Sequence, residues 1–194
     1  VTIPARADAL AGALAWFDSG AFADVLRRRV ALRTESQRPE AGPALHTYLA
    51  DEIGPSVARL GFTWRIADNP VSGAGPFLLA ERREGDGLPT VLVYGHGDVV
   101  QGYDAQWRSG RSPWTLTCEG DRWYGRGTAD NKGQHSINLA ALERVLAARG
   151  CLGFNVRLLM ETGEETGSPG LHALCERERA ALRADVLVAS DGPR

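Results

Sequence analysis

Lysine is nearly absent from this chain of 194 residues: Lys132 is the only one, although lysine and arginine together number 22. The formal net charge is −2, and no basic run is long enough to follow a phosphate backbone, so we expect no nucleic-acid partner. No apolar stretch approaches the roughly 18 to 20 residues that span a bilayer, so we expect no membrane partner. The first residues, VTIPARADAL, also lack the profile of a signal peptide.

Cysteine is scarce as well. Cys118, Cys151 and Cys175 have no paired spacing, which argues against a disulfide framework and favours a reducing compartment. We therefore expect a cytoplasmic protein whose cysteines are small buried apolar side chains. Motifs of two common enzyme classes are also missing: the chain has no G-x-x-x-x-G-K-[ST] phosphate loop and no G-x-S-x-G nucleophile elbow. Nucleotide binding and serine-nucleophile chemistry therefore have little support.

Helical and strand patterns alternate along the chain. Helices are expected over 20–34, about 39–60 and 133–149, the last with Ile137, Ala141, Val145 and Leu146 on its apolar side. Strands are expected over 62–68, 76–83, 89–100, 154–160 and 184–192, with a hairpin over 114–126. Ser168 and Pro169 predict the start of one more helix. This alternation predicts an α/β fold with a mostly parallel central sheet.

Acidic or imidazole residues follow four of the predicted strand or hairpin ends. They are His96, Asp98, Asp130, Glu164, Glu165 and Asp191. Ligands of open α/β sheets bind beyond the carboxyl ends of the strands, so we expect these side chains to meet at one site. One imidazole with several carboxylates and no thiolate suits zinc, with cobalt or manganese as alternatives.

The spacing within two of these motifs has a mechanical meaning. One ring nitrogen of His96 can bind a metal while Asp98 holds the other nitrogen and fixes the tautomer, so we count Asp98 among the catalytic residues. On a strand, Glu164 and Glu165 would point to opposite faces, so they can share a site only in a loop. In a loop, one glutamate can bind a metal while the other, with a free oxygen about 3 Å from a water, acts as a base.

Four segments together resemble the M20 family of metallopeptidases, which includes carboxypeptidases, dipeptidases and aminoacylases with a site for two metal ions. The segments are GHGDVV, WYGRGTADNKGQ, ETGEETGS and VASDGPR, and the resemblance covers about residues 15–194. It implies a three-layer sandwich of the zinc-exopeptidase type. It also implies that a metal-activated water hydrolyses an amide bond next to a free carboxylate, in a dipeptide or an N-acyl amino acid.

The resemblance further implies a role for each residue. His96 and Asp191 would bind one metal ion, and Asp130 would bridge both ions. Glu165 would bind the second ion, while Glu164 would stay off the metals as the general base. The peptide bond that follows Asp130 would be cis.

The chain departs from the family in its length. Family members are much longer, with a lid and dimerisation domain after the Asp191 strand and a late histidine that completes the Glu165 site. We therefore interpret residues 1–194 as the N-terminal part of a catalytic domain without the lid. We expect one well-formed and one incomplete metal site, little or no activity from this part alone, and either exposed apolar surface or an associated copy, such as a homodimer.

Two alternatives remain open. One is a deacylase or desuccinylase of the same architecture, and the other is a non-catalytic metal-binding half-domain. His46, His135 and His172 are further imidazoles in the chain, but each falls in a predicted helix or helix start. We interpret all three as polar residues on helix surfaces.

Overall fold

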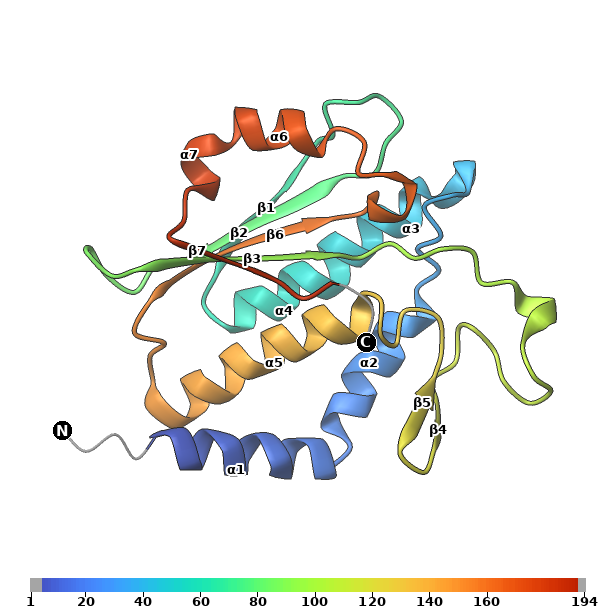
Figure 1. The fold of residues 1–194 in the computed structure, drawn as a ribbon, viewed down its shortest axis with the longest axis horizontal. Helices are drawn as coiled ribbons and strands as arrows, with labels where there is room; N and C mark the ends of the chain where they lie inside the picture. Colours follow the sequence, from blue (N-terminus) through green and yellow to red (C-terminus); the bar gives the residue numbers. More distant parts are fainter. Residues whose placement is uncertain (1–4, 192–194) are drawn as a thin grey trace.

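The computed structural model describes residues 5–191, which form a mixed α/β fold around a five-stranded sheet (Figure 1). The strand order is β1–β2–β6–β3–β7. The strands are β1 (Thr63–Ala67), β2 (Phe77–Arg82), β3 (Thr90–His96), β6 (Asn155–Glu161) and β7 (Val186–Ala189). β3 is parallel to β6 and β7, whereas β2 is antiparallel to β1 and β6. Four of the five strands therefore point the same way, which confirms the predicted mostly parallel sheet.

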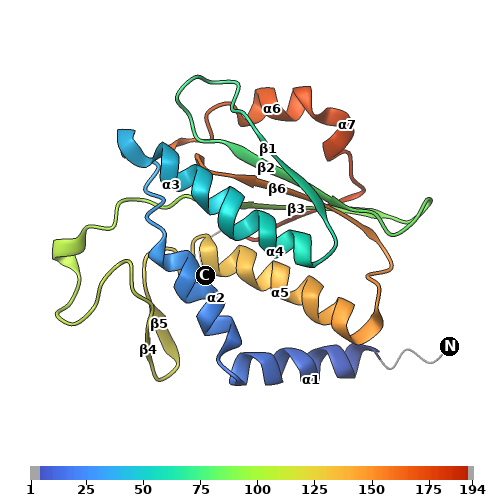
Figure 2. The same ribbon diagram turned by 180° about the vertical axis from the view of Figure 1, so that it is seen from behind.

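Helices cover both faces of the sheet (Figures 1 and 2). They are α1 (Ala5–Asp18), α2 (Ala21–Ala31), α3 (Gly42–Thr47), α4 (Gly54–Arg59), α5 (Lys132–Arg149), α6 (Leu171–Arg177) and α7 (Arg179–Leu182). α6 and α7 lie on one face, and α3, α4 and α5 lie on the other. α1 and α2 pack against α5 on its outer side. The result is the three-layer sandwich that the resemblance implies.

A layer of apolar side chains fills each side of the sheet. Leu78 and Met160 pack with the residues of the α3–α5 side, whereas their strand neighbours Leu79 and Leu159 pack with Leu174 of α6. All five are buried. This division follows from the two-residue period of a strand, because successive side chains point to opposite faces.

Leu174 anchors α6 to the sheet, so its truncation should be costly. It is fully buried, and we expect Leu174→Ala to lower the free energy of unfolding by about 2 to 5 kcal/mol, through lost burial and the cavity left behind. Chemical denaturation of this chain measures the change. Leu14→Ala on α1, where the side chain is 64% exposed, should change the free energy of unfolding by no more than about 0.5 kcal/mol. Equal losses in the two variants would contradict this description of the core.

The predicted elements are present with differences in detail. The helical stretch over 39–60 runs as a 3-10 turn (Pro39–Ala41), α3, a π-helical segment (Tyr48–Ile53) and α4. The hairpin forms a separate two-stranded sheet of β4 (Thr117–Glu119) and β5 (Arg122–Tyr124). α1 is not among the predicted helices, because its apolar residues lie on all sides of the helix and produce no helical period.

The predicted start of the helix that follows β6 is wrong. α6 begins at Leu171, after Gly170, which has a left-handed φ of 83°. Ser168 does not cap this helix. Its own φ is 52°, and its Oγ donates a hydrogen bond to Glu161 Oε1 at 3.0 Å. The serine therefore belongs to the loop before the helix.

The expectation of buried cysteines is wrong for two of the three. Cys118 and Cys151 are exposed, and Cys175 is half-buried; all three are free thiols. A cytoplasmic location stays a prediction.

The edge strand β7 presents apolar side chains to solvent. Val186 is 51% exposed, Leu187 62% and Val188 38%, and within residues 5–191 only one edge of β7 is paired. The expected exposed apolar surface is therefore confirmed.

Across residues 5–191, no single helix is long and apolar enough to cross a membrane. Residues Arg6–Asp18 and Ala21–Ala31, bent by 61° relative to each other, satisfy that test only as a pair.

Candidate metal centre

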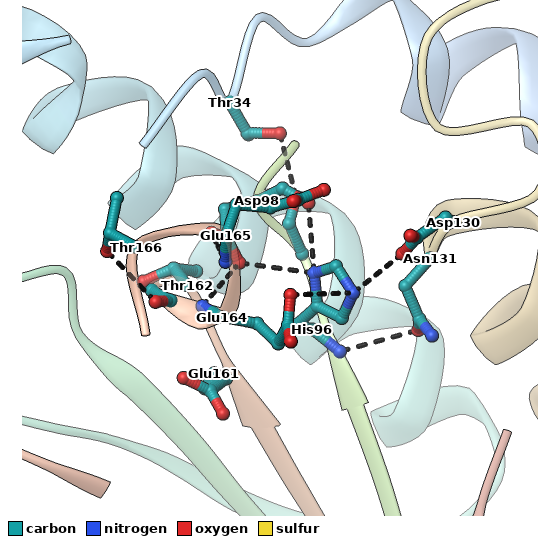
Figure 3. A network of polar contacts seen from close by, with 12 residues as sticks. Thr34, His96, Asp98, Asp130, Asn131, Glu161, Thr162, Glu164, Glu165 and Thr166 are labelled. Atoms are coloured by element: carbon teal, nitrogen blue, oxygen red, sulfur yellow. Dashed lines mark hydrogen bonds and ion pairs between the residues drawn. The ribbon is translucent and has the colours of Figure 1, made fainter. Parts of the chain in front are cut away.

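The strand ends bring the predicted site residues to one edge of the sheet, and Figure 3 shows His96, Asp98, Asp130 and the two glutamates lying together. His96 is the last residue of β3 and lies in register with Glu161, the last residue of β6. Asp191 follows the end of β7, which is parallel to β3, and Asp130 lies in the loop just before α5. The parallel pairing of β6, β3 and β7 therefore places residues far apart in the sequence beside one another.

His96 is the centre of the cluster. Its side chain is fully buried, and its Nε2 lies 2.9 Å from Asp130 Oδ1, 3.8 Å from Asp191 Oδ2 and 3.9 Å from Glu164 Oε2. Two groups have ligand atoms within 4.8 Å of one another: His96, Asp130 and Glu165, and His96, Glu164 and Asp191. The structure therefore brings all of these side chains together, and it places each glutamate of the pair in a different group.

Asp98 holds both His96 and the loop that carries the glutamates. It is fully buried, with Oδ1 3.3 Å and its main-chain oxygen 3.1 Å from His96 Nδ1. The backbone N–H groups of Glu164 and Glu165 donate to the Asp98 carboxylate at 3.3 and 3.1 Å. The first contact is the orienting one expected from the sequence. The bonds from the glutamate N–H groups to Asp98 cannot be inferred from the spacing, because they join segments 66 residues apart.

The glutamate pair leaves the strand before it reaches the cluster. β6 ends at Glu161, and residues Glu164–Thr166 form a 3-10 turn. Thr162 Oγ1 donates to the main-chain oxygen of Pro76 at 2.7 Å, which ties the start of the loop to the rest of the fold. Because the two glutamates lie in a turn rather than a strand, their side chains are not forced to opposite faces.

Negative charge is concentrated in this cluster. Burial alone lowers the pKa of His96, but Asp98, Asp130 and Asp191 outweigh it and raise this pKa to about 9. Burial, with neighbouring carboxylates, raises the pKa of Glu164 and also that of Glu165. Glu164 and Glu165 are therefore harder to ionise beside the other carboxylates, and a bound cation would relieve this repulsion. Nitrogen and carboxylate oxygen donors without thiolates fit a divalent ion such as zinc.

A second set of polar residues lies buried behind the cluster. His135, expected on a helix surface, is 1% exposed; its Nε2 lies 2.7 Å from Tyr48 Oη and its Nδ1 lies 3.1 Å from Asn131 Oδ1. Burial lowers the pKa of His135 well below its usual range. The predicted apolar side of α5 is partly right: Val145 and Leu146 pack against the core, but Ile137 is 48% exposed, and the unpredicted Leu139 is buried. His46 and His172 are exposed, as expected.

Lys132, the only lysine, is also buried behind the site. Its Nζ donates to the main-chain oxygens of Arg29 and Leu32 at the end of α2, and lies 5.0 Å from the centre of the Tyr48 ring. Burial lowers the pKa of Lys132 to about 7. The Asp130–Asn131 peptide bond just before it is cis, as the resemblance implies.

Comparison with known families agrees with this geometry. A profile of the Peptidase family M20/M25/M40 matches residues 92–193, more than half of the chain. The chain belongs to this M20 family. The matched segment contains all six residues of the cluster, so the family resemblance expected from the four motifs is confirmed.

Relatives of this M20 chain include a dipeptidase and a deacetylase. It is 32% identical over 184 residues to the β-Ala-His dipeptidase of Mus musculus, covering 88% of this chain and 37% of the dipeptidase. It is 30% identical over 170 residues to the acetylornithine deacetylase of Erwinia tasmaniensis, covering 88% and 42%. The crystal structure of human carnosine dipeptidase 1 has a TM-score of 0.85 at 27% identity, over 95% of this chain and 42% of that one. The M20 chain therefore spans about two fifths of the length of these relatives.

Proposed function

We propose that this chain supplies the metal-binding part of an enzyme that hydrolyses an amide bond next to a free carboxylate, in a dipeptide or an N-acyl amino acid. The observation that carries the proposal is the meeting of His96 Nε2 with the carboxylates of Asp130, Asp191 and Glu164 at the strand ends. The names of its dipeptidase and deacetylase relatives support the same reaction class, cleavage of an amide bond.

The proposal assigns two divalent ions to the cluster. His96, Asp130 and Asp191 would hold the first ion, and Asp130 and Glu165 would hold the second. Zinc suits these donors best, with cobalt or manganese as alternatives. When bound, such an ion polarises a carbonyl and makes water acidic enough to react near neutral pH.

Glu164 is the proposed general base. Its side chain is 36% exposed, so it can reach a substrate and a water while staying next to the buried His96. Asp98 would keep the His96 ring oriented and hold the turn with both glutamates in place.

Zinc titration of this chain, stripped of metal with a chelator, tests the site. The first ion has three protein ligands and the second has two, so we expect one tight equivalent and one much weaker equivalent. Isothermal titration calorimetry measures both. Two tight equivalents would contradict the incomplete second site, and no tight binding would contradict the metal centre as a whole.

A deacylase is the second candidate function, because a deacetylase is among the relatives. Assays of the complete enzyme with a set of dipeptides and a set of N-acyl amino acids separate the two. We propose the dipeptidase first, and a higher kcat/KM for N-acyl amino acids would reverse that order. A homodimer stays a prediction.

A further inference from the structure

We propose that Asn131 is the positioning residue that holds three ligand-bearing segments in place. This inference rests on the proposed metal site. It concerns a residue that touches neither the substrate nor the metal ions in that proposal.

Asn131 has a complete set of hydrogen bonds although it is fully buried. Its Oδ1 accepts from the backbone N–H of His96 at 3.4 Å and lies 3.1 Å from His135 Nδ1. Its Nδ2 donates to the main-chain oxygen of Ser190 at 2.7 Å and to Gln134 Oε1 at 2.9 Å. With no solvent access, a lost bond here leaves a buried polar group without a partner.

These bonds join the segments that carry the candidate ligands of the first ion. The backbone of His96 itself is one partner, at the end of β3. Ser190 is another, and it directly precedes Asp191 after β7. Asn131 itself directly follows Asp130. A single amide therefore links the backbone positions of His96, Asp130 and Asp191. The carboxylates of Asp130 and Asp191 lie within 4 Å of His96 Nε2.

The main-chain partners of Asn131 determine which way its amide faces, because His96 offers an N–H donor and Ser190 offers a carbonyl acceptor. Because Nδ1 of His135 faces the amide oxygen, it carries the proton and donates, which leaves Nε2 to accept from the Tyr48 hydroxyl at 2.7 Å. A reversed amide would place two donors against each other at the His96 N–H and two acceptors against each other at the Ser190 oxygen. The buried chain therefore favours one orientation, in which the amide bonds to His96 and Ser190 together.

Only an amide side chain supplies both the acceptor oxygen for His96 and the N–H donor for Ser190. Asn131→Leu keeps approximately the same shape and removes all four bonds. Asn131→Asp keeps the acceptor oxygen for His96 but offers no N–H to Ser190 or Gln134, so among the ligand-bearing segments it releases only that of Asp191. Contacts behind metal ligands typically contribute 10- to 100-fold to metal affinity, and we expect a loss of roughly this size for Asn131→Leu and a smaller loss for Asn131→Asp.

Asn155 provides a matched control. It is 7% exposed and also makes four bonds: Oδ1 accepts from the N–H groups of Glu84 and Gly85, and Nδ2 donates to the main-chain oxygens of Gly85 and Leu88. It lies at the start of β6, at the opposite end of the strand from the cluster. Asn155→Leu should therefore lower the melting temperature without changing metal affinity.

The test uses this chain and zinc, with the dissociation constant measured by competition with a chromophoric chelator, and Co²⁺ as a spectroscopic probe. We expect weaker zinc binding and an altered Co²⁺ visible spectrum in both Asn131 variants, and neither change in Asn155→Leu. Unchanged affinity and spectrum in Asn131→Asp, or an equal loss of affinity in Asn155→Leu, would overturn the inference. If Asn131→Leu does not fold, Asn131→Asp decides. Failure of the unsubstituted chain to bind zinc would instead overturn the proposed function.

Discussion

Replacing Glu164 by glutamine in the complete enzyme should lower kcat by about 10²- to 10⁴-fold, the usual contribution of a general base, while the metal content stays the same. Glutamine has nearly the same shape as glutamate but cannot take up a proton. Metal analysis and steady-state kinetics on the same preparation measure both quantities.

Glu165→Gln is the informative partner of this variant, because the proposal makes that residue a ligand. We expect it to lower the metal content, whereas Glu176→Gln, on the exposed surface of α6, should change neither quantity. The specific alternative is that Glu164 is itself a metal ligand, since it lies in a group with His96 and Asp191 that could hold an ion. Loss of metal in Glu164→Gln with metal retained in Glu165→Gln would mean that the two roles are exchanged.

Asp130→Ala should have the broadest effect on metal binding. Asp130 is the proposed bridge, and its Oδ1 is the carboxylate oxygen nearest to His96 Nε2 among the ion-pair contacts of that nitrogen. Its removal takes a ligand from both ions, so each affinity should fall by more than the roughly 10- to 100-fold typical of a contact behind a ligand. Activity of the complete enzyme should fall to background.

Metal analysis after dialysis, together with zinc titration, measures this loss. Asp121→Ala is the matched control, because Asp121 lies exposed in the β4–β5 hairpin outside the cluster. Retention of both ions by Asp130→Ala would contradict the bridging role, even if activity were lost.

The sequence predicts the gathering of the site because most of its residues end a strand or follow one within a few residues; Asp130, in the loop before α5, is the exception. His96, for example, ends β3, and Asp191 follows β7, so the parallel pairing of these strands is enough to bring them to one edge. Roles within the glutamate pair do not follow in this way. They depend on how a short turn directs two side chains, and that turn is held by Asp98 from a distant part of the chain.

The buried polar layer behind the site escaped prediction for a different reason. Hydrophobic periodicity assumes that the inward side of a helix is apolar, but Lys132 and His135 in the first turn of α5, and Asn131 just before it, are buried instead. These residues have polar partners on other elements, such as Tyr48, that the sequence does not place beside them. A buried polar network is recognisable only when its partners are known in space.

The burial of Lys132 has a practical consequence for chemical labelling. Because it is the only lysine, amine-directed reagents have a single side chain to modify, and in the native fold it is fully enclosed with its Nζ bonded to the end of α2. Modification of this amine requires α2 and the start of α5 to separate. The rate of Lys132 acylation, measured by mass spectrometry, would therefore report how often the region directly behind the metal centre opens.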